Sequence, residues 1–170
     1  MGIDVSVDVE FRRKIMDMHQ GARLMYCYQC NHCTYDCPIS KLVGSDVYNP
    51  RKLILHSFLG MKGNILGKKE NPALWACMTC DTCDEVCPND IELTNIFYVL
   101  RNLSVKSGEA PAAYLMQAKT IFENGKAIPM SGPIERRRGQ MGLKSLPEAP
   151  LDEIQTILKE RGVDKVLPAE

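Results

Sequence analysis

The chain has 170 residues, of which 45% are apolar and 25% charged, a composition ordinary for one globular domain with an appended segment. Its 21 basic residues are balanced by 21 acidic ones, which argues against nucleic acid as a partner because nucleic-acid binding needs a basic face. The longest stretch without Asp, Glu, Lys or Arg is residues 24–35, too short to span a bilayer, so we expect no membrane partner either.

The first predicted element is a helix over residues 8–20. Asp8 is a suitable N-cap, and Phe11, Ile15 and Met18 recur at helical spacing to give one apolar face. We interpret this helix as a lid over the cysteines that follow, with a partner-docking helix as the alternative.

Two cysteine groups then share the spacing C-x2-C-x2-C-x3-C-P and use all eight cysteines of the chain. This run holds cubane clusters in two-cluster ferredoxins, where three thiolates of one group bind one cluster and the fourth reaches the other. We therefore predict two 4Fe-4S clusters, which would make the loaded protein acidic. The predicted ligands are Cys27, Cys30, Cys33 and Cys87 for the first cluster, and Cys77, Cys80, Cys83 and Cys37 for the second.

Other uses of cysteine fit this pattern less well. A structural zinc site normally takes two C-x2-C pairs and needs no fourth cysteine followed by proline. A disulfide framework is typical of shorter secreted chains, and a thioredoxin-like pair needs no repetition. His32 lies inside the first group, but no cysteine is missing there, so we expect it beside the cluster or on the surface rather than as a ligand.

Between the two groups we predict one helix. Residues 39–48 resemble a loop that turns at 44–46, after which Asn49 and Pro50 give a helix start and Gly60 a helix end. Residues 61–71 are interpreted as a surface loop with at most one short turn. Trp75, just before the second group, either shields that cluster from water or belongs to an ordinary core.

Two helices are predicted after the second group, over residues 93–105 and 111–124, each with an apolar face and a glycine beyond its end. No alternating strand pattern is present. The predicted fold is mainly α, an all-helical ferredoxin-like domain over residues 1–125, in which two clusters replace much of a core.

The remaining residues, 126–170, are rich in proline and glycine and are predicted to form a tail with a short helix over 152–161, capped by Asp152. The tail carries the arginine run 136–138, which is either solvated or docks on an acidic partner. A helix of this length is marginal alone, so we expect it to pack either on this protein or on a partner, and we predict that the tail as a whole docks on a partner.

The N-terminus shows no basic segment followed by an apolar one, as a signal peptide would, and its Met-Gly start with Ser6 is a chance match to the myristoylation pattern. Thiolates on iron require a reducing compartment. We therefore expect a cytoplasmic protein.

The paired motifs, the Asn-Pro-Arg-Lys-Leu-Ile-Leu segment beginning at Asn49 and the Leu-Trp-Ala-Cys segment ending at Cys77 resemble the C subunit of heterodisulfide reductase. The resemblance covers roughly residues 10–165. It implies a methanogenic archaeal complex in which the A subunit carries flavin and clusters and the B subunit reduces the coenzyme M–coenzyme B disulfide. It also leaves room for a hydrogenase or a formate dehydrogenase in the same complex.

The same motifs resemble iron–sulfur subunits of succinate dehydrogenase, fumarate reductase and anaerobic glycerol-3-phosphate dehydrogenase. This chain lacks the C-x4-C-x2-C domain that precedes the motifs in the first two, and the cysteine-rich domain fused to membrane-bound heterodisulfide reductases. The resemblance therefore implies the stand-alone form.

No nucleophile–base group and no phosphate-binding glycine loop is present, so we predict an electron-transfer subunit of an oxidoreductase with no catalytic residue of its own. A free two-cluster ferredoxin, or a subunit of another anaerobic dehydrogenase, is the alternative. A diffusible carrier needs little beyond its clusters, whereas this chain has long segments outside the motifs, which favours fixed docking.

Overall fold

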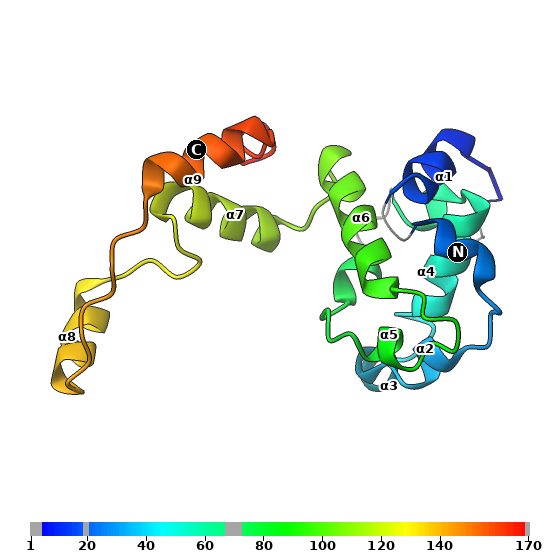
Figure 1. The fold of residues 1–170 in the computed structure, drawn as a ribbon, viewed down its shortest axis with the longest axis horizontal. Coiled ribbons are helices and arrows are strands. Elements are labelled where there is room, and N and C mark those ends of the chain that lie inside the picture. Colours follow the sequence, from blue (N-terminus) through cyan, green and yellow to red (C-terminus); the bar gives the residue numbers. More distant parts are fainter. Residues whose placement is uncertain (1–4, 19–20, 67–72, 169–170) are drawn as a thin grey trace. The chain divides into compact units, whose positions relative to one another are not determined.

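The computed structural model describes residues 5–18, 21–66 and 73–168. The chain divides between Ala110 and Pro111 into two compact units, here called the N-terminal unit (1–110) and the C-terminal unit (111–170). Figure 1 shows that all described secondary structure is helical, which confirms the predicted fold class. The helix predicted over 111–124 lies in the C-terminal unit by this division, whereas the predicted cluster domain extends to residue 125.

The N-terminal unit contains α-helices and short 3-10 helices in close succession. Its α-helices are α1 (Val9–Met16), α2 (His32–Tyr35), α3 (Pro38–Val43), α4 (Pro50–Leu59), α5 (Thr82–Glu85) and α6 (Leu93–Lys106). Its 3-10 helices are η1 (Gly21–Tyr26), η2 (Lys62–Asn64) and η3 (Ala73–Ala76).

Helix α1 is held at its start by the predicted cap, since Asp8 Oδ1 accepts a hydrogen bond from Phe11 N at 2.8 Å. The helix buries Phe11 and Ile15 and ends earlier than predicted, so that Met18 lies beyond it and is exposed. The predicted residues 19 and 20 lie outside the described part of the chain. Helix α1 packs on α4, α6 and η1, and none of its residues lines either cysteine cavity. It is therefore part of the helical packing and not the predicted lid.

Helix α4 has the predicted boundaries. Asn49 Oδ1 accepts from Lys52 N at 3.0 Å, Pro50 occupies the first turn, and Gly60 ends the helix with φ at 73°. A side chain at Gly60 would place its Cβ 2.8 Å from Asp8 O, and Gly60 O itself accepts from Asp8 N at 2.8 Å. Glycine is therefore needed here both for the left-handed turn and for the close approach of α1.

Two parts of the intervening chain differ from the prediction. Residues 38–43 form α3 instead of a loop, because Pro38 starts a helix directly after Cys37 and Ser40 Oγ donates to Tyr48 O at 2.9 Å. The loop after α4 contains the short helix η2, but Ile65 and Leu66 behind it are buried rather than on the surface. Residues 67–71 of the predicted loop lie outside the described residues.

Helix α6 supplies the largest share of the core. It has nearly the predicted length, and its inward face buries Leu93, Ile96, Phe97 and Leu100 at 3% exposure or less. It packs on α4, α5 and η3, so the long helix after the second cysteine group lies beside the long helix between the two groups. The two cysteine loops are thereby attached to one rigid pair of helices.

The C-terminal unit contains α7 (Ala112–Asn124), α8 (Gly132–Gln140) and α9 (Leu151–Glu160). Helices α7 and α9 pack together, and Gln155 Nε2 donates to Phe122 O at 3.1 Å. None of the described residues of this unit is buried. The weakness of this core distinguishes the unit from the N-terminal one.

Two predictions for this segment are corrected. The arginine run lies on helix α8 rather than in an irregular tail. Glu135 lies in the first turn of this helix and the arginines lie near its end, and charges in these places stabilise a helix through its dipole. Asp152 does not cap α9. It lies in the first turn, and Pro150 precedes the helix without a side-chain cap.

Candidate metal centres

The two cysteine loops have the same backbone conformation. In each loop the residues on either side of the middle cysteine have positive φ angles: 55° at Gln29 and 73° at Asn31, then 50° at Thr79 and 58° at Asp81. Such left-handed conformations cost on the order of 1–3 kcal/mol each away from glycine, and they persist only where the surroundings impose them. Because the same conformation occurs twice, we infer that both loops are shaped to surround the same kind of bound group.

A short helical turn follows each loop and carries its third cysteine. Asn31 O accepts from Thr34 N at 3.0 Å, and Asp81 O accepts from Asp84 N at 2.9 Å, at equivalent positions of α2 and α5. The fourth cysteine then lies beyond the turn and is followed by proline. Each loop thus places its first three cysteine thiols on one side, and the fourth cysteine lies apart from them.

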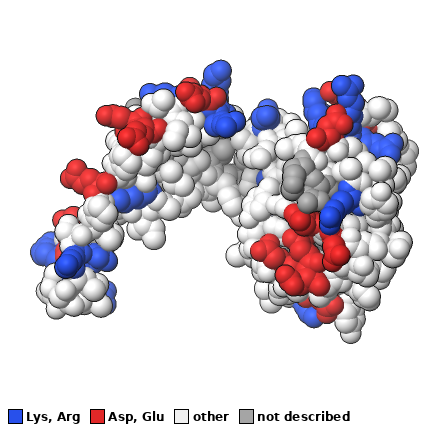
Figure 2. Space-filling model, viewed as in Figure 1, with Lys and Arg blue, Asp and Glu red and all other residues white. Residues whose placement is uncertain are grey.

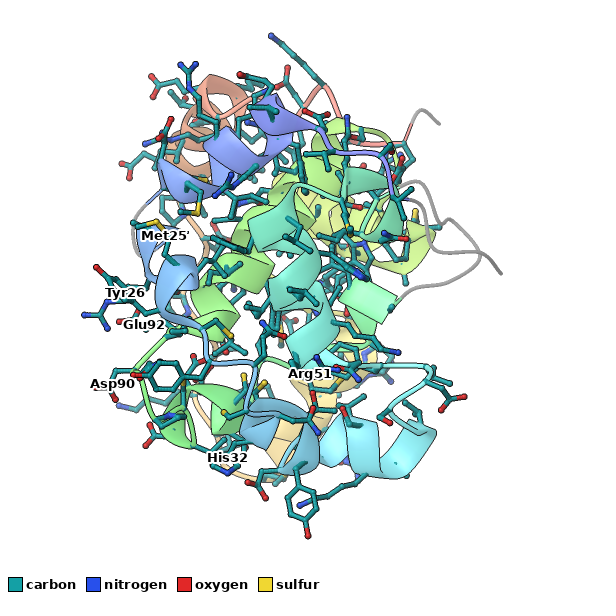
Figure 3. All side chains as sticks on the ribbon, turned by 90° about the vertical axis from the view of Figure 1, so that its right-hand side faces the viewer. Met25, Tyr26, His32, Arg51, Asp90 and Glu92 are labelled. Carbon is teal, nitrogen blue, oxygen red and sulfur yellow. The ribbon has the colours of Figure 1, made fainter. Side chains whose placement is uncertain are left out.

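The first cavity is lined by Cys27, Cys30, Cys33 and Cys87. Its buried wall consists of Ile54, Ile91 and Leu93, which are 1–3% exposed. Cys30 is exposed, so this cavity has one thiol at the surface and three set deeper. Figure 3 shows Tyr26, Asp90 and Glu92 along one edge of the unit, and they adjoin residues that line the cavity.

The second cavity is lined by Cys37, Cys77, Cys80 and Cys83. Cys80 is exposed, whereas the other three thiols are only 7–8% exposed. Tyr48 and Thr94 form part of the buried wall. Each cavity therefore combines three thiols of one motif with one of the other, which is the predicted grouping; the ligation of iron by these eight residues remains a prediction.

Hydrogen-bond donors surround the thiols. Gln29 Nε2 lies 3.2 Å from Cys27 Sγ, and the Ile91 N–H donates to Cys87 Sγ at 3.4 Å. At the second cavity the Thr79 N–H donates to Cys77 Sγ at 3.4 Å. Donors aimed at sulfur stabilise its negative form, so these contacts suit thiolates better than neutral thiols.

Burial acts against the thiolates when no cation is present. It raises the pKa of Cys33 to about 11, although a hydrogen bond with Thr34 lowers it in part. The three other thiols of the cavity, Cys27, Cys30 and Cys87, raise that pKa further. Burial and then the nearby Asp84 carboxylate raise the pKa of Cys83 as well. The thiols of these cavities therefore need bound cations in order to ionise together.

The donor set fits a cubane cluster, because each cavity offers four thiols, one for each iron. His32 is exposed at the rim of the first cavity, which agrees with its expected place beside the cluster. Trp75 lines neither cavity. Its indole N–H donates to Ser104 Oγ at 3.3 Å and Arg101 stacks over its ring at 5.2 Å, so it belongs to the packing beneath η3.

Comparison with known proteins gives a consistent result. The family model described as a 4Fe-4S dicluster domain matches residues 23–91. The C subunit of the H2:CoB-CoM heterodisulfide,ferredoxin reductase of Methanothermobacter thermautotrophicus is 30% identical over 168 residues, covering 95% of this chain and 87% of that protein. The iron-sulfur C 2 subunit of the CoB–CoM heterodisulfide reductase of Methanocaldococcus jannaschii is 32% identical over 147 residues, 83% of this chain and 75% of the relative.

This chain belongs to the family of heterodisulfide reductase C subunits. A further relative, named as a protein like the heterodisulfide reductase C subunit, comes from Archaeoglobus profundus and is 31% identical over 144 residues, 81% of this chain and 73% of its own length. As a member of the C-subunit family the chain is an electron-transfer iron–sulfur protein, and its cofactors are two 4Fe-4S clusters.

Several contacts around the thiols of this C-subunit chain were not predicted from the sequence. Gln29 and Thr94 contact cysteine sulfurs in the structure, but neither residue type is one from which such a contact can be predicted. Tyr48 lies eleven positions after Cys37 and reaches the second cavity only because α3 turns the chain back. Arg101 on α6 donates through Nη2 to the Cys77 carbonyl, a contact between residues 24 positions apart. Within the described residues no helix is both long and apolar enough to cross a membrane.

Proposed function

We propose that this chain conducts electrons within a heterodisulfide reductase, from an A subunit that holds flavin and further clusters to a B subunit that reduces the mixed disulfide of coenzyme M and coenzyme B. The main support for this proposal is that one compact unit contains two cavities of four thiols, each with its own exposed cysteine. The names of the relatives support the disulfide and also mention H2 and formate, which favours a hydrogenase or formate dehydrogenase upstream.

The proposed ligands follow the lining of the cavities. Cys27, Cys30, Cys33 and Cys87 would hold the first cluster, and Cys77, Cys80, Cys83 and Cys37 the second. When bound, the clusters take up and release single electrons; the chain fixes their positions and exposure and donates hydrogen bonds to the thiolates. Thiolates on iron also favour the cytoplasm, where we propose that the protein works.

The exposed edges of the two sites differ in chemistry, which supports two different partners. Around Cys30 the surface carries apolar and aromatic side chains, since Met25, Tyr26 and Tyr28 are 56–75% exposed, and the exposed carboxylate of Asp90 lies at the same edge. Around Cys80 it is acidic, with Asp81 and Glu85 exposed, and Figure 2 shows acidic side chains gathered over the α5 region. A free carrier needs only one exposed surface at which a cluster can exchange electrons, whereas a protein that links two others needs two such surfaces.

The C-terminal unit is the proposed anchor to the complex. Its described residues include none that are buried, and Ile128, Met141 and Ile157 are 58–72% exposed, so much of its apolar surface is left for another protein to cover. Arg136 and Arg137 are exposed on α8, which favours an acidic surface on the partner.

Metal content tests the proposal first. Anaerobically purified protein should hold about eight irons and eight sulfides, the content of two cubane clusters. Stoichiometric zinc without labile sulfide would contradict it. Copurification of a flavin-containing protein and a second cluster-containing one tests the proposed position in the complex, whereas a chain that purifies alone at full cluster content supports the free ferredoxin instead.

The crossed ligand sets are tested by Cys87→Ser. An oxygen ligand or an open corner should change the potential and spin signal of the cluster held by Cys27, Cys30 and Cys33. Cys30→Ser and Cys80→Ser serve as matched references, one for each cavity. Spectra of reduced Cys87→Ser should match those of Cys30→Ser; a match to Cys80→Ser would show that each motif closes on its own cluster.

A further inference from the structure

The first cysteine of each loop receives a hydrogen bond, but the two donors differ in kind. In the second loop the backbone N–H of Thr79 donates to Cys77 Sγ at 3.4 Å. In the first loop the donor is a side chain, since Gln29 Nε2 donates to Cys27 Sγ at 3.2 Å. A backbone donor is placed by the fold of the loop, whereas the last torsion of a glutamine side chain is loosely restrained. The contact to Cys27 therefore depends on whatever holds the amide of Gln29.

Arg51 holds this amide. It lies in the first turn of α4 (Figure 3), and its Nη1 donates to Gln29 Oε1 at 3.3 Å. A guanidinium group only donates hydrogen bonds, and in an amide only the oxygen accepts them, so the contact decides which end of the Gln29 amide faces Arg51. The oxygen faces Arg51, and the NH2 group is left to face Cys27.

The same guanidinium also reaches the far side of Cys30. Arg51 Nε donates to Asn31 Oδ1 at 3.1 Å. Gln29 and Asn31 are the two residues of this loop with positive φ angles. Arg51 thus bonds both left-handed residues at once, which requires donors in the fixed, planar arrangement of a guanidinium.

The backbone that carries Arg51 is itself anchored to the first site. The Arg51 N–H donates to Thr34 Oγ1 at 3.2 Å, and this hydroxyl donates to Asn49 Oδ1 at 3.0 Å. Thr34 is 5% exposed and lies on α2, directly after Cys33. The start of α4 is therefore bonded to the turn that carries the third cysteine, and the Arg51 side chain extends from a fixed point.

We propose that Arg51 is a positioning residue of the first site, which raises the reduction potential of that site by aiming the Gln29 amide at Cys27. The inference rests on the proposed ligand role of Cys27. A hydrogen bond to a ligating sulfur stabilises the more negative, reduced state and so raises the potential. Uptake of one electron from the donor makes and breaks no bond at Arg51 or Gln29.

The second loop has a different arrangement at the equivalent positions. Thr79 Oγ1 donates to Met78 O at 2.8 Å, within the loop, and Asp81 is exposed. The donor to Cys77 is part of the backbone. Changes at Arg51 are therefore expected to act on the first site alone.

The charge of Arg51 acts in the same direction as its hydrogen bonds, because a half-buried cation also favours a more negative site. Arg51→Lys separates the two effects, since lysine keeps the charge but presents it as a point and not as a fork. Gln29→Met removes the donor to sulfur without a change of charge. The two variants together with their double variant form a cycle that shows whether Arg51 acts through Gln29.

The test uses the full-length, anaerobically purified chain, titrated with redox mediators and followed by electron paramagnetic resonance. Cys30→Ser and Cys80→Ser assign each signal to a cavity. In Arg51→Lys and in Gln29→Met the first midpoint should fall so that its one-electron equilibrium shifts about tenfold, roughly 59 mV, while the second midpoint stays unchanged. The double variant should fall no further than Gln29→Met alone.

Lys52→Arg is the matched control, because it makes the reverse exchange one position along α4, where the side chain is exposed and lines neither cavity. It should leave both midpoints unchanged. The proposal is overturned if Lys52→Arg has the same effect as Arg51→Lys, if the first midpoint stays unchanged in Arg51→Lys or Gln29→Met, or if the second midpoint moves instead. It is also overturned if the double variant falls by the sum of the two shifts, since Arg51 then acts independently of Gln29.

Loss of the first cluster has a defined meaning as well. If Arg51→Lys loses it while Lys52→Arg keeps it, Arg51 holds the loop together instead of adjusting its potential, and the proposal is overturned. If Gln29→Met does not fold, Gln29→Glu keeps the shape and an acceptor for Arg51 but has no donor for sulfur; an unchanged first midpoint then contradicts the proposal, and a lower one supports it. Iron and sulfide analysis of the unmodified chain separates these failures from failure of the proposed function, which alone predicts the cluster content.

Discussion

Residues of the N-terminal unit such as Phe97 and Leu100 are fully buried, whereas the C-terminal unit has no buried side chain among its described residues. The N-terminal unit combines this core with two cavities of four thiols each, in which one thiol is exposed and three are set deeper. The C-terminal unit has one helix pair, α7 with α9, and leaves large apolar side chains exposed. This difference in burial supports the proposal that the N-terminal unit is stable by itself once its cofactors are bound, whereas the C-terminal unit is covered by a partner.

Removal of the clusters should give the largest effect. Stripping iron and sulfide with a chelator and then reducing the cysteines leaves four thiols without cations in each cavity, and metal binding contributes directly to folding in such sites. We expect the N-terminal unit to lose its cooperative thermal transition. Trp75, the only tryptophan, lies in this unit and reports on it through near-ultraviolet circular dichroism. An unchanged midpoint after stripping would show that the helical core is sufficient.

Truncation should separate the two units by role. Deleting residues 126–170 removes α8 and α9 and should release the chain from its partners while both clusters remain. Deleting 111–170 should have the same effect on copurification and leave the thermal transition of the N-terminal unit within a few degrees. The measurement is copurification together with iron content. A chain that still copurifies fully after the shorter deletion would place the anchor elsewhere.

Core truncation should affect the units unequally. Leu100→Ala empties a fully buried site and should cost about 2–5 kcal/mol of the free energy of unfolding of the N-terminal unit. Leu158→Ala removes a half-buried side chain on α9 and should cost less than about 1 kcal/mol in the free chain. Chemical denaturation of both variants measures the difference. Equal costs would mean that the C-terminal unit is more tightly packed than its exposure indicates.

The smallest expected effect compares two glycines with similar backbone angles, Gly108 with φ at 72° and Gly125 with φ at 65°. A Cβ at Gly108 meets nothing within 4 Å, whereas one at Gly125 would lie 2.6 Å from Ala149 Cβ. Gly108→Ala should therefore cost about 1 kcal/mol from backbone strain alone. Gly125→Ala should add a loosening of α9, detected as faster amide exchange in residues 151–160. Identical exchange in the two variants would contradict this packing.

The sequence predicted those features that depend on short-range chemistry. The start of α4 at Asn49 and Pro50 and its end at Gly60 follow from capping, and the spacing of the cysteines predicted two equivalent sites. Helix α3 was missed because six residues are too few to show a helical period. Helix α8 was missed because Gly132, Pro133 and Gly139 are typical of loops, although the first two occupy its opening turn.

The parts of the site that were missed depend on long-range packing. No local pattern indicates that Tyr48 lines the same cavity as Cys77, or that Arg101 reaches the carbonyl of Cys77, since these positions arise only when α3, α4 and α6 assemble. The division of the chain is similar. The predicted tail began at 126, but α7 packs on α9, and only the folded chain reveals that its apolar face belongs with the C-terminal unit.

The exchange of the fourth cysteine between the two cavities has a consequence for biosynthesis. The first cavity takes three thiols from residues 27–33 and its last one from Cys87. A chain emerging from the ribosome begins to fold at its N-terminus, yet on the proposed ligand sets its first cluster has only three ligands until the second motif has been translated. Completion of the first cluster is therefore expected only after Cys87 has left the ribosome, when all eight cysteines of the chain are available together.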